Sequence, residues 1–268
     1  MMAIDASHDN FMCQWLKPER IRDCPGIIGW RLCEEAAFRD VAIPCLAGAC
    51  SVHLRDPDEY TAEVTEILED AGFRATAVAL GELEQASDEV QKGMVGEVLA
   101  GEYLQQFEGY RVPVYRLRYR FSRTVSPPGE DVIAVRVEGD QVDVCVVEAK
   151  VRGQFQSHAV EEALDQLRRY TDDPRPQALM LIREVLWDRG ERDMWRVFVR
   201  LGDPSHPDHP GRRYLIFLVT GNRPRQPFGA VKDVDHGLDD LHGVSLSLTH
   251  LDAVIFSALN TEVDVSEL

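Results

Sequence analysis

Residues 144–151 read Val-Cys-Val-Val-Glu-Ala-Lys-Val, an apolar run that ends in two charged side chains. Successive side chains of a β-strand point to opposite faces, so residues two apart share a face. The run therefore predicts a buried strand from which Glu148 and Lys150 project side by side. Burying a carboxylate and an ammonium is costly unless they pair or hold a metal ion. This strand is consequently the first candidate for a functional site.

A strand with acidic residues at its start precedes this one. Residues 130–135 read Glu-Asp-Val-Ile-Ala-Val, and a hairpin turn at 138–141 leads into the apolar run. We favour Asp131 over Glu130 as the site residue, because the apolar strand begins directly after Asp131 and Glu130 still belongs to the turn. Asp143 is a rival, but its position in a regular strand turns it to the face opposite Glu148.

A helix is predicted further upstream. Residues 87–107 carry apolar side chains at helical spacing, and Ser87 is a suitable N-cap. Glu97 lies inside the apolar part of this helix, where it is either a solvated helical glutamate or part of the site.

Between these two elements, residues 110–122 predict a strand, because three arginines in it alternate with Tyr115, Leu117, Tyr119 and Phe121. One face of that strand would carry Arg116, Arg118 and Arg120. The face is either simply exposed or a strip that contacts phosphate groups.

Downstream, residues 157–171 predict a helix on which Gln166 and Tyr170, four residues apart, share one face. Apolar stretches at 178–182, 195–201 and 214–220 predict further strands. The C-terminal stretch 246–259 is apolar enough to pack on the rest of the protein.

Taken in order, these elements resemble the PD-(D/E)xK nuclease superfamily, whose core is a helix, three antiparallel strands, a helix and a fourth strand. The Gln-x3-Tyr spacing further resembles the branch that includes RecB-type nucleases. The resemblance implies an α/β (α+β mixed sheet) fold with a restriction-endonuclease-like core. One departure is that Gly129-Glu130 precedes Asp131, where the superfamily usually has a proline directly before the acid.

The resemblance also implies roles for the site residues. Asp131 and Glu148, with the backbone carbonyl of Ala149, would bind Mg²⁺, or Mn²⁺ in its place, and Glu97 would complete the metal site. Lys150 would position the attacking water and neutralise developing negative charge. Gln166 and Tyr170 would either bind DNA or support the metal ligands through hydrogen bonds.

The runs at 92–104, 127–135 and 147–150 resemble more closely the HamA nucleases of Hachiman-type anti-phage systems. That resemblance implies pairing with a superfamily-2 helicase, HamB, and degradation of DNA in antiviral defence. Two alternatives remain open: a non-catalytic nuclease-fold module that regulates a helicase, and a stand-alone restriction or repair endonuclease.

The chain of 268 residues has a net charge of −17, which is unusual for a protein that contacts nucleic acid. Hydrophobic residues make up 44% of it, so it is globular rather than disordered. It has no apolar run of membrane-spanning length and no signal-peptide pattern at its start, so no membrane association is expected and a cytoplasmic location is the default.

Residues 1–86 read as a separate acidic region, a probable partner-binding segment, before a nuclease-like domain at 87–268. Within this region we expect a helix at 31–41, broken by Pro44, and a second helix at 58–71.

Overall fold

The computed structural model describes residues 10–22, 24–54, 66–67, 69–74, 87–119, 129–139, 141–172, 176–203, 210–232 and 234–261. Its strands are β1 (Leu16–Ile21), β2 (Ile28–Glu34), β3 (Val132–Glu138), β4 (Gln141–Arg152), β5 (Gly211–Thr220) and β6 (Leu241–Ser247). Its helices are α1 (Phe11–Trp15), α2 (Arg39–His53), α5 (Asp88–Glu108), α6 (Ser157–Asp172), α7 (Pro176–Asp188), α8 (Arg192–Leu201) and α9 (Leu251–Asn260), with short 3-10 helices η2 (Ala36–Phe38) and η3 (Arg116–Tyr119).

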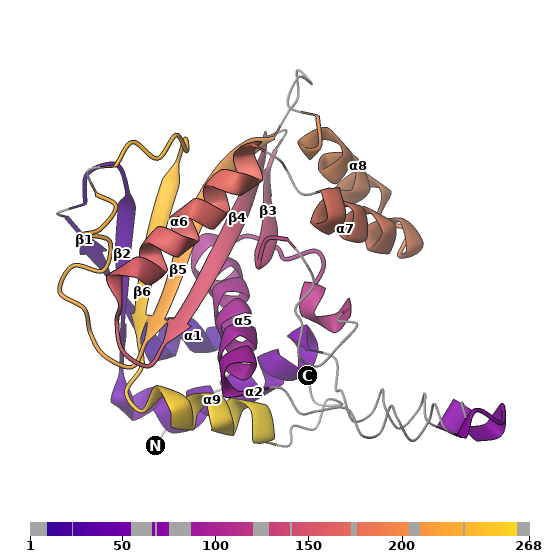
Figure 1. The fold of residues 1–268 in the computed structure, drawn as a ribbon, viewed down its shortest axis with the longest axis horizontal. Helices are drawn as coiled ribbons and strands as arrows, with labels where there is room; N and C mark the ends of the chain where they lie inside the picture. Colours follow the sequence, from indigo (N-terminus) through magenta and orange to yellow (C-terminus); the bar gives the residue numbers. More distant parts are fainter. Residues whose placement is uncertain are drawn as a thin grey trace.

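The six strands form one mixed sheet in the order β1-β2-β6-β5-β4-β3 (Figure 1). β3 and β4 are antiparallel neighbours joined by the predicted hairpin, whereas β4, β5, β6 and β2 run parallel to one another. Parallel strands are usually buried on both faces, which explains the uninterrupted apolar run of β5. The mixed α/β fold class predicted from the sequence is confirmed.

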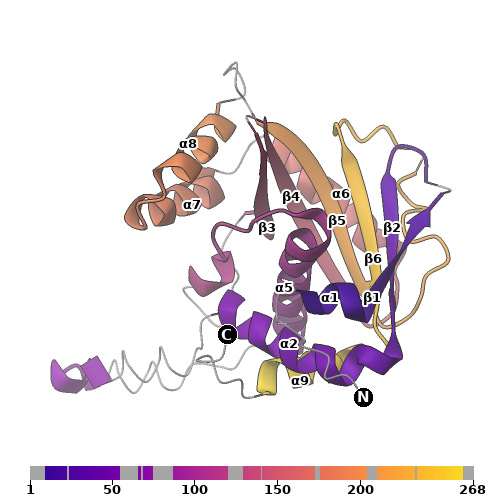
Figure 2. The ribbon, with the colours of Figure 1, turned by 180° about the vertical axis from the view of Figure 1, so that it is seen from behind.

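Helices cover both faces of the sheet. α5, α1, α2 and α9 lie on one face (Figure 2), and α6 lies on the other (Figure 1). The alternation of β4 matches these two layers, because Cys145 and Val147 pack in the core beneath α5 while Val144 and Val146 pack in the core beneath α6. The strand is therefore buried on both sides along its centre.

The helix predicted at 87–107 is confirmed as α5. The Ser87 hydroxyl accepts a hydrogen bond from the Val90 amide at 3.4 Å, which caps the first turn. The helix predicted at 157–171 is confirmed as α6. The strands predicted after Asp131, around Glu148 and at 214–220 are confirmed as β3, β4 and β5.

The strand predicted at 110–122 is wrong for the residues that the structure describes. Only an isolated bridge pairs Arg111 with Val135, and residues 116–119 form η3. Proline cannot donate a ladder hydrogen bond, so Pro113 prevents the pairing with β3 from continuing beyond the bridge. Residues 120–122 lie outside the described part of the chain.

The strands predicted at 178–182 and 195–201 are helices instead, within α7 and α8. The buried residues of α7 recur at helical rather than alternating spacing, at Ala178, Leu179, Ile182, Val185 and Leu186. A short apolar run does not distinguish a strand from a helix by itself, and the full spacing of the element decides between them.

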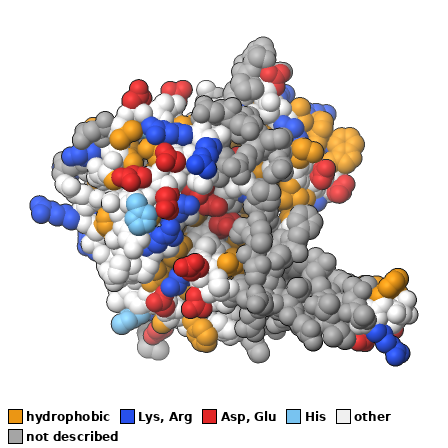
Figure 3. Space-filling model, in the orientation of Figure 1, with side chains coloured by type: hydrophobic (Ala, Val, Ile, Leu, Met, Phe, Trp, Pro, Cys, Tyr) orange, Lys and Arg blue, Asp and Glu red, His pale blue; other side chains and the backbone are white. Residues whose placement is uncertain are grey.

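The outer side of α7 and α8 carries exposed apolar side chains (Figure 3). Met180 and Trp187 are 52% and 50% exposed. Trp187 meets Trp195 edge to face with ring centroids 5.3 Å apart, and the Arg192 guanidinium lies 3.5 Å from the Trp187 ring.

The helix predicted at 31–41 is also wrong, because residues 28–34 form β2 and α2 begins at Arg39. Pro44 lies inside α2 rather than ending it. Burial of the following residues, Cys45 to Cys50, against the body of the protein outweighs the local cost of the proline. Of the helix predicted at 58–71, only residues 66–67 and 69–70 are described as helical.

The described part of the N-terminal region joins the same sheet and core as the rest of the chain. β2 pairs with β6, and Trp15 and Leu46 belong to the hydrophobic cluster that contains Leu99 of α5. The division at residue 86 stays a prediction. None of the helices in the described ranges has the length and apolarity needed to cross a bilayer.

Candidate active site

The β3–β4 hairpin brings Asp131 next to Glu148. The register pairs Val132 with Val147, so Asp131 lies one step further along, opposite Glu148. The Ala149 amide donates a hydrogen bond to Asp131 Oδ2 at 2.7 Å. The two acids are seventeen positions apart in the sequence, and the pairing of the two strands brings them together.

Glu148 and Lys150 lie side by side on β4, as the sequence predicts. Lys150 Nζ donates to Glu148 Oε1 at 2.7 Å, and the two side chains are only 18% and 6% exposed. In a regular strand they also share the face of Val144 and Val146, which packs beneath α6. The pairing of the two charges makes their burial tolerable.

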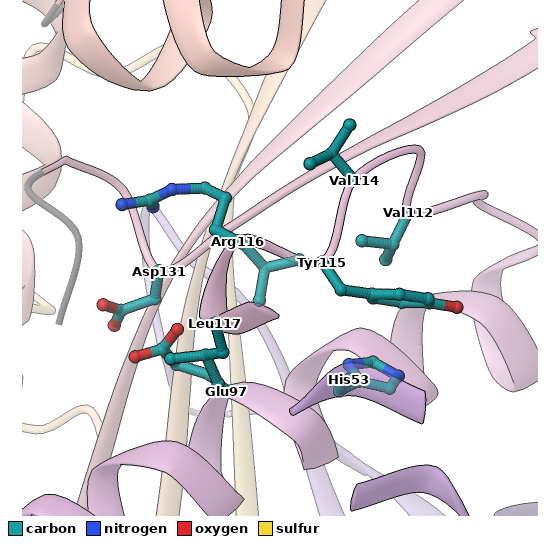
Figure 4. Close-up of a pocket in the computed structure, with 9 residues that line it drawn as sticks. His53, Glu97, Val112, Val114, Tyr115, Arg116, Leu117 and Asp131 are labelled. Atoms are coloured by element: carbon teal, nitrogen blue, oxygen red, sulfur yellow. The ribbon is translucent and has the colours of Figure 1, made fainter. Parts of the chain in front are cut away.

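Glu97 reaches the same region from α5. It is 9% exposed, which excludes the alternative of a fully solvated helical glutamate. Its carboxylate points toward that of Asp131 (Figure 4). An open pocket between α5 and the hairpin is lined by Glu97, Asp131 and Lys150, together with Ser87, Glu89, Val90, Gly93 and Ala149.

Burial and the neighbouring Glu148 carboxylate raise the pKa of Asp131 to about 7. The Ala149 amide and the positive charges of Lys150 and Arg116 act in the opposite direction. Carboxylates that disfavour one another's ionisation are typical of sites that hold a cation or perform acid–base chemistry.

The donor chemistry of this cluster suits a hard divalent cation, because Mg²⁺ and Mn²⁺ prefer carboxylate and carbonyl oxygens. In the part of the chain that the structure describes, however, no three His, Cys, Asp or Glu side chains form a group that could hold a metal ion. A metal site here would need the Ala149 carbonyl or water among its ligands. Metal binding by Asp131, Glu148 and Glu97 therefore stays a prediction.

Of the three arginines predicted to form one strip, the two that the structure describes, Arg116 and Arg118, do not share a face. Arg116 is buried at 5% exposure and lines an inner cavity beside Glu97 and Asp131 (Figure 4). Arg118 points elsewhere and donates to the backbone oxygen of Val52 at 2.7 Å. The difference arises because η3 winds at three residues per turn, whereas a strand alternates every two. Arg120 lies outside the described residues.

Gln166 is half-buried on α6, the helix that covers the face of β4 to which Glu148 and Lys150 belong. The Tyr170 side chain lies outside the described part of the chain. The roles proposed for Gln166 and Tyr170 in binding DNA or supporting the metal ligands stay predictions.

One residue near the site was missed in the sequence analysis. His53, at the end of α2, lines the inner cavity with Glu97 and Asp131. Its Nε2 lies 2.8 Å from Glu102 Oε1, and its ring stacks at 3.9 Å against Tyr115. The signal was the continuation of the apolar pattern beyond Pro44, which would have placed His53 in a buried helix.

Two comparisons with known proteins concern this part of the chain. The family model described as HamA matches residues 38–241, a range that includes Glu97, Asp131, Glu148 and Lys150. A protein of Bacillus cereus described as Hachiman protein HamA is 32% identical over 169 residues, which is 62% of this chain and 60% of that protein. The match thus spans less than two thirds of the relative's length.

Proposed function

Because this chain belongs to the HamA family of Hachiman anti-phage defence, we propose that it is a metal-dependent nuclease that hydrolyses phosphodiester bonds of DNA. The observation that carries the proposal is the meeting of Asp131, Glu148 and Lys150 at one end of the β3–β4 hairpin. Glu97 adds a carboxylate from the neighbouring helix.

The residues have separate tasks in this reaction. Asp131 and Glu148, with Glu97, would hold Mg²⁺, or Mn²⁺ in its place, which when bound supplies charge stabilisation at the phosphate and lowers the pKa of its water. Lys150 would orient the attacking water and neutralise charge that develops on the phosphate oxygens. The ion pair with Glu148 holds the Lys150 ammonium at the site.

The proposal predicts that metal removal abolishes cleavage. The purified chain is incubated with plasmid and linear DNA in Mg²⁺, in Mn²⁺ and in excess EDTA, and the products are followed on gels. We expect degradation with either ion and at least a hundredfold slower loss of substrate in EDTA, because the metal is required to activate the water.

A catalytically silent chain gives a different result in this assay. Undiminished cleavage in EDTA would exclude the metal mechanism. No cleavage in any metal, with or without a helicase, would favour the non-catalytic regulatory module.

The proposal includes a superfamily-2 helicase of the HamB type as a partner. The charge of −17 opposes unaided binding to a phosphate backbone, and this repulsion supports delivery to DNA by another protein. Within residues 1–86, Ile67 and Phe73 are 58% and 60% exposed beside exposed acids. Exposed apolar side chains rimmed by charge are typical of protein-binding surfaces.

Reversing three of these charges tests the partner-binding surface. We expect the variant Glu66→Lys, Glu69→Lys, Asp70→Lys to bind the purified helicase about tenfold more weakly in a titration, because rim charges contribute to partner selection. The matched control is Glu184→Lys with Asp188→Lys on α7, which are also exposed. Equal affinity of both variants and the wild type would remove this segment from the interface.

A further inference from the structure

Arg116 occupies a position that its sequence context does not predict. It is 5% exposed, and its side chain lies beside those of Asp131 and Glu97 (Figure 4). All three residues line the same cavity. Lys150 lines the open pocket with the same two acids, so each of the two pockets that Asp131 and Glu97 border also has a basic side chain in its wall.

The segment that delivers Arg116 is held from two directions. On one side, Arg189, in the turn that follows α7, donates to the Pro113 carbonyl at 3.1 Å and to the Tyr119 hydroxyl at 3.2 Å. On the other side, the Tyr115 ring stacks on His53. These contacts flank Arg116 before and after it in the sequence. The residues before and after Arg116 are therefore held in place, which limits the positions that its buried side chain can take.

The backbone that leads into β3 is shaped to leave room for this side chain. Gly129 adopts a φ of +116°, which L side chains rarely adopt. A Cβ on Gly129 would lie 3.5 Å from Arg116 Nη2 and 2.8 Å from Ala178 Cβ. Asp131, two residues later, thus starts from a backbone packed between Arg116 and α7.

We propose that Arg116 is a positioning residue of the nuclease site, one that fixes Asp131 and Glu97 in the arrangement that binds the divalent cation. The inference rests on the proposed function. An arginine suits this task because its planar guanidinium presents several donors in a fixed geometry and keeps its charge when buried. Lysine would preserve the charge but not the geometry.

The test measures Mn²⁺ binding to the full chain by titration calorimetry, independently of cleavage. We expect Arg116→Ala to bind Mn²⁺ about 10- to 100-fold more weakly, the usual effect of losing a group that orients metal ligands. The Mn²⁺ affinity of Arg116→Lys should lie between those of the wild type and Arg116→Ala. Added guanidinium ion should restore part of the affinity of Arg116→Ala by entering the space left by the side chain.

The control is Arg111→Ala, which removes the same charge from the same segment. The Arg111 side chain is 59% exposed and pairs with Glu191, away from the carboxylates. Its Mn²⁺ affinity should stay within twofold of wild type. Thermal melting of each variant shows whether it is folded, and rescue by guanidinium is a result that a merely unfolded variant cannot give.

The possible outcomes separate the inference from the function on which it rests. Equal or tighter Mn²⁺ binding by folded Arg116→Ala overturns the inference, because an arginine that only repels the cation would weaken binding while present. Absence of Mn²⁺ binding by the wild type overturns the proposed metal site and the inference together. If the wild type binds Mn²⁺ and cleaves DNA, and the Arg116→Ala variant binds Mn²⁺ with the same affinity, the inference is overturned and the proposed function stands.

Discussion

Replacing Lys150 by alanine is expected to reduce the rate of Mg²⁺-dependent DNA cleavage by about a thousandfold, since loss of one charge-stabilising group costs about a hundred- to a thousandfold. Lys150 is 18% exposed and borders the pocket shared by Asp131 and Glu97. In the proposed mechanism its ammonium neutralises charge on the phosphate. The rate is measured as initial loss of supercoiled plasmid at saturating Mg²⁺.

Glu148→Ala should lower the rate at least as much, for a different reason. It removes a proposed metal ligand and also the carboxylate that pairs with Lys150 at 2.7 Å. At non-saturating Mg²⁺ the loss should be larger than at saturating Mg²⁺, because metal affinity falls as well. Lys150→Ala should show a smaller dependence on metal concentration.

Lys92→Ala is the matched control for Lys150→Ala. Lys92 lies on α5 and forms a surface ion pair with Asp252, whose side chain is 75% exposed. Such pairs contribute little to stability, so this variant should melt and cleave as the wild type does. Rates of Lys150→Ala and Glu148→Ala within threefold of wild type, with all variants folded, would refute the proposed site.

The hairpin of the site could be predicted because its signals are local. Alternation alone places Glu148 and Lys150 on one face, and the turn at 138–141 fixes which strand lies beside them. Asp131 follows from the same reasoning, since it directly precedes the apolar residues of β3. These features depend on neighbouring residues in the sequence, so they do not change with the packing of distant parts of the chain.

The position of Arg116 could not be predicted by the same means. Basic and aromatic residues alternate at 115–119, and that pattern is typical of a strand. Pro113 and the contacts from Arg189, which follows α7, favour a 3-10 turn instead, and this turn changes the direction of the side chains at 116–119. The contacts come from residues more than sixty positions away, which a local pattern does not contain.

The remaining errors have a related origin. β2 and α7 were assigned the wrong type because short apolar runs fit either a strand or a helix. Their type is set by the partner available in space. Residues 28–34 pair with β6, which comes more than two hundred positions later, and α7 buries its apolar side against α8 and the sheet. The sequence pattern shows that these segments are buried but not in which layer.

Gly96→Ala is expected to destabilise the protein by about 2 kcal/mol. An added Cβ would lie 2.4 Å from Cγ2 of Val151, so α5 and β4 would have to move apart. Overpacking of this kind costs about 3 kcal/mol at the upper end of its usual range, against about 1 kcal/mol gained from the higher helix propensity of alanine. The free energy of unfolding is measured by denaturant titration. Because Glu97 is the next residue, cleavage should also slow.

Two further variants make this prediction specific. Gly93→Ala, one turn earlier on α5, meets nothing within 4 Å of its added Cβ and should therefore be neutral or stabilising by up to about 1 kcal/mol. Val151→Ala should relieve the clash, so the double variant with Gly96→Ala should lose less stability than the sum of the two single losses. Additive losses, or a Gly96→Ala variant as stable as Gly93→Ala, would mean that the close approach of α5 to β4 does not hold Glu97 at the site.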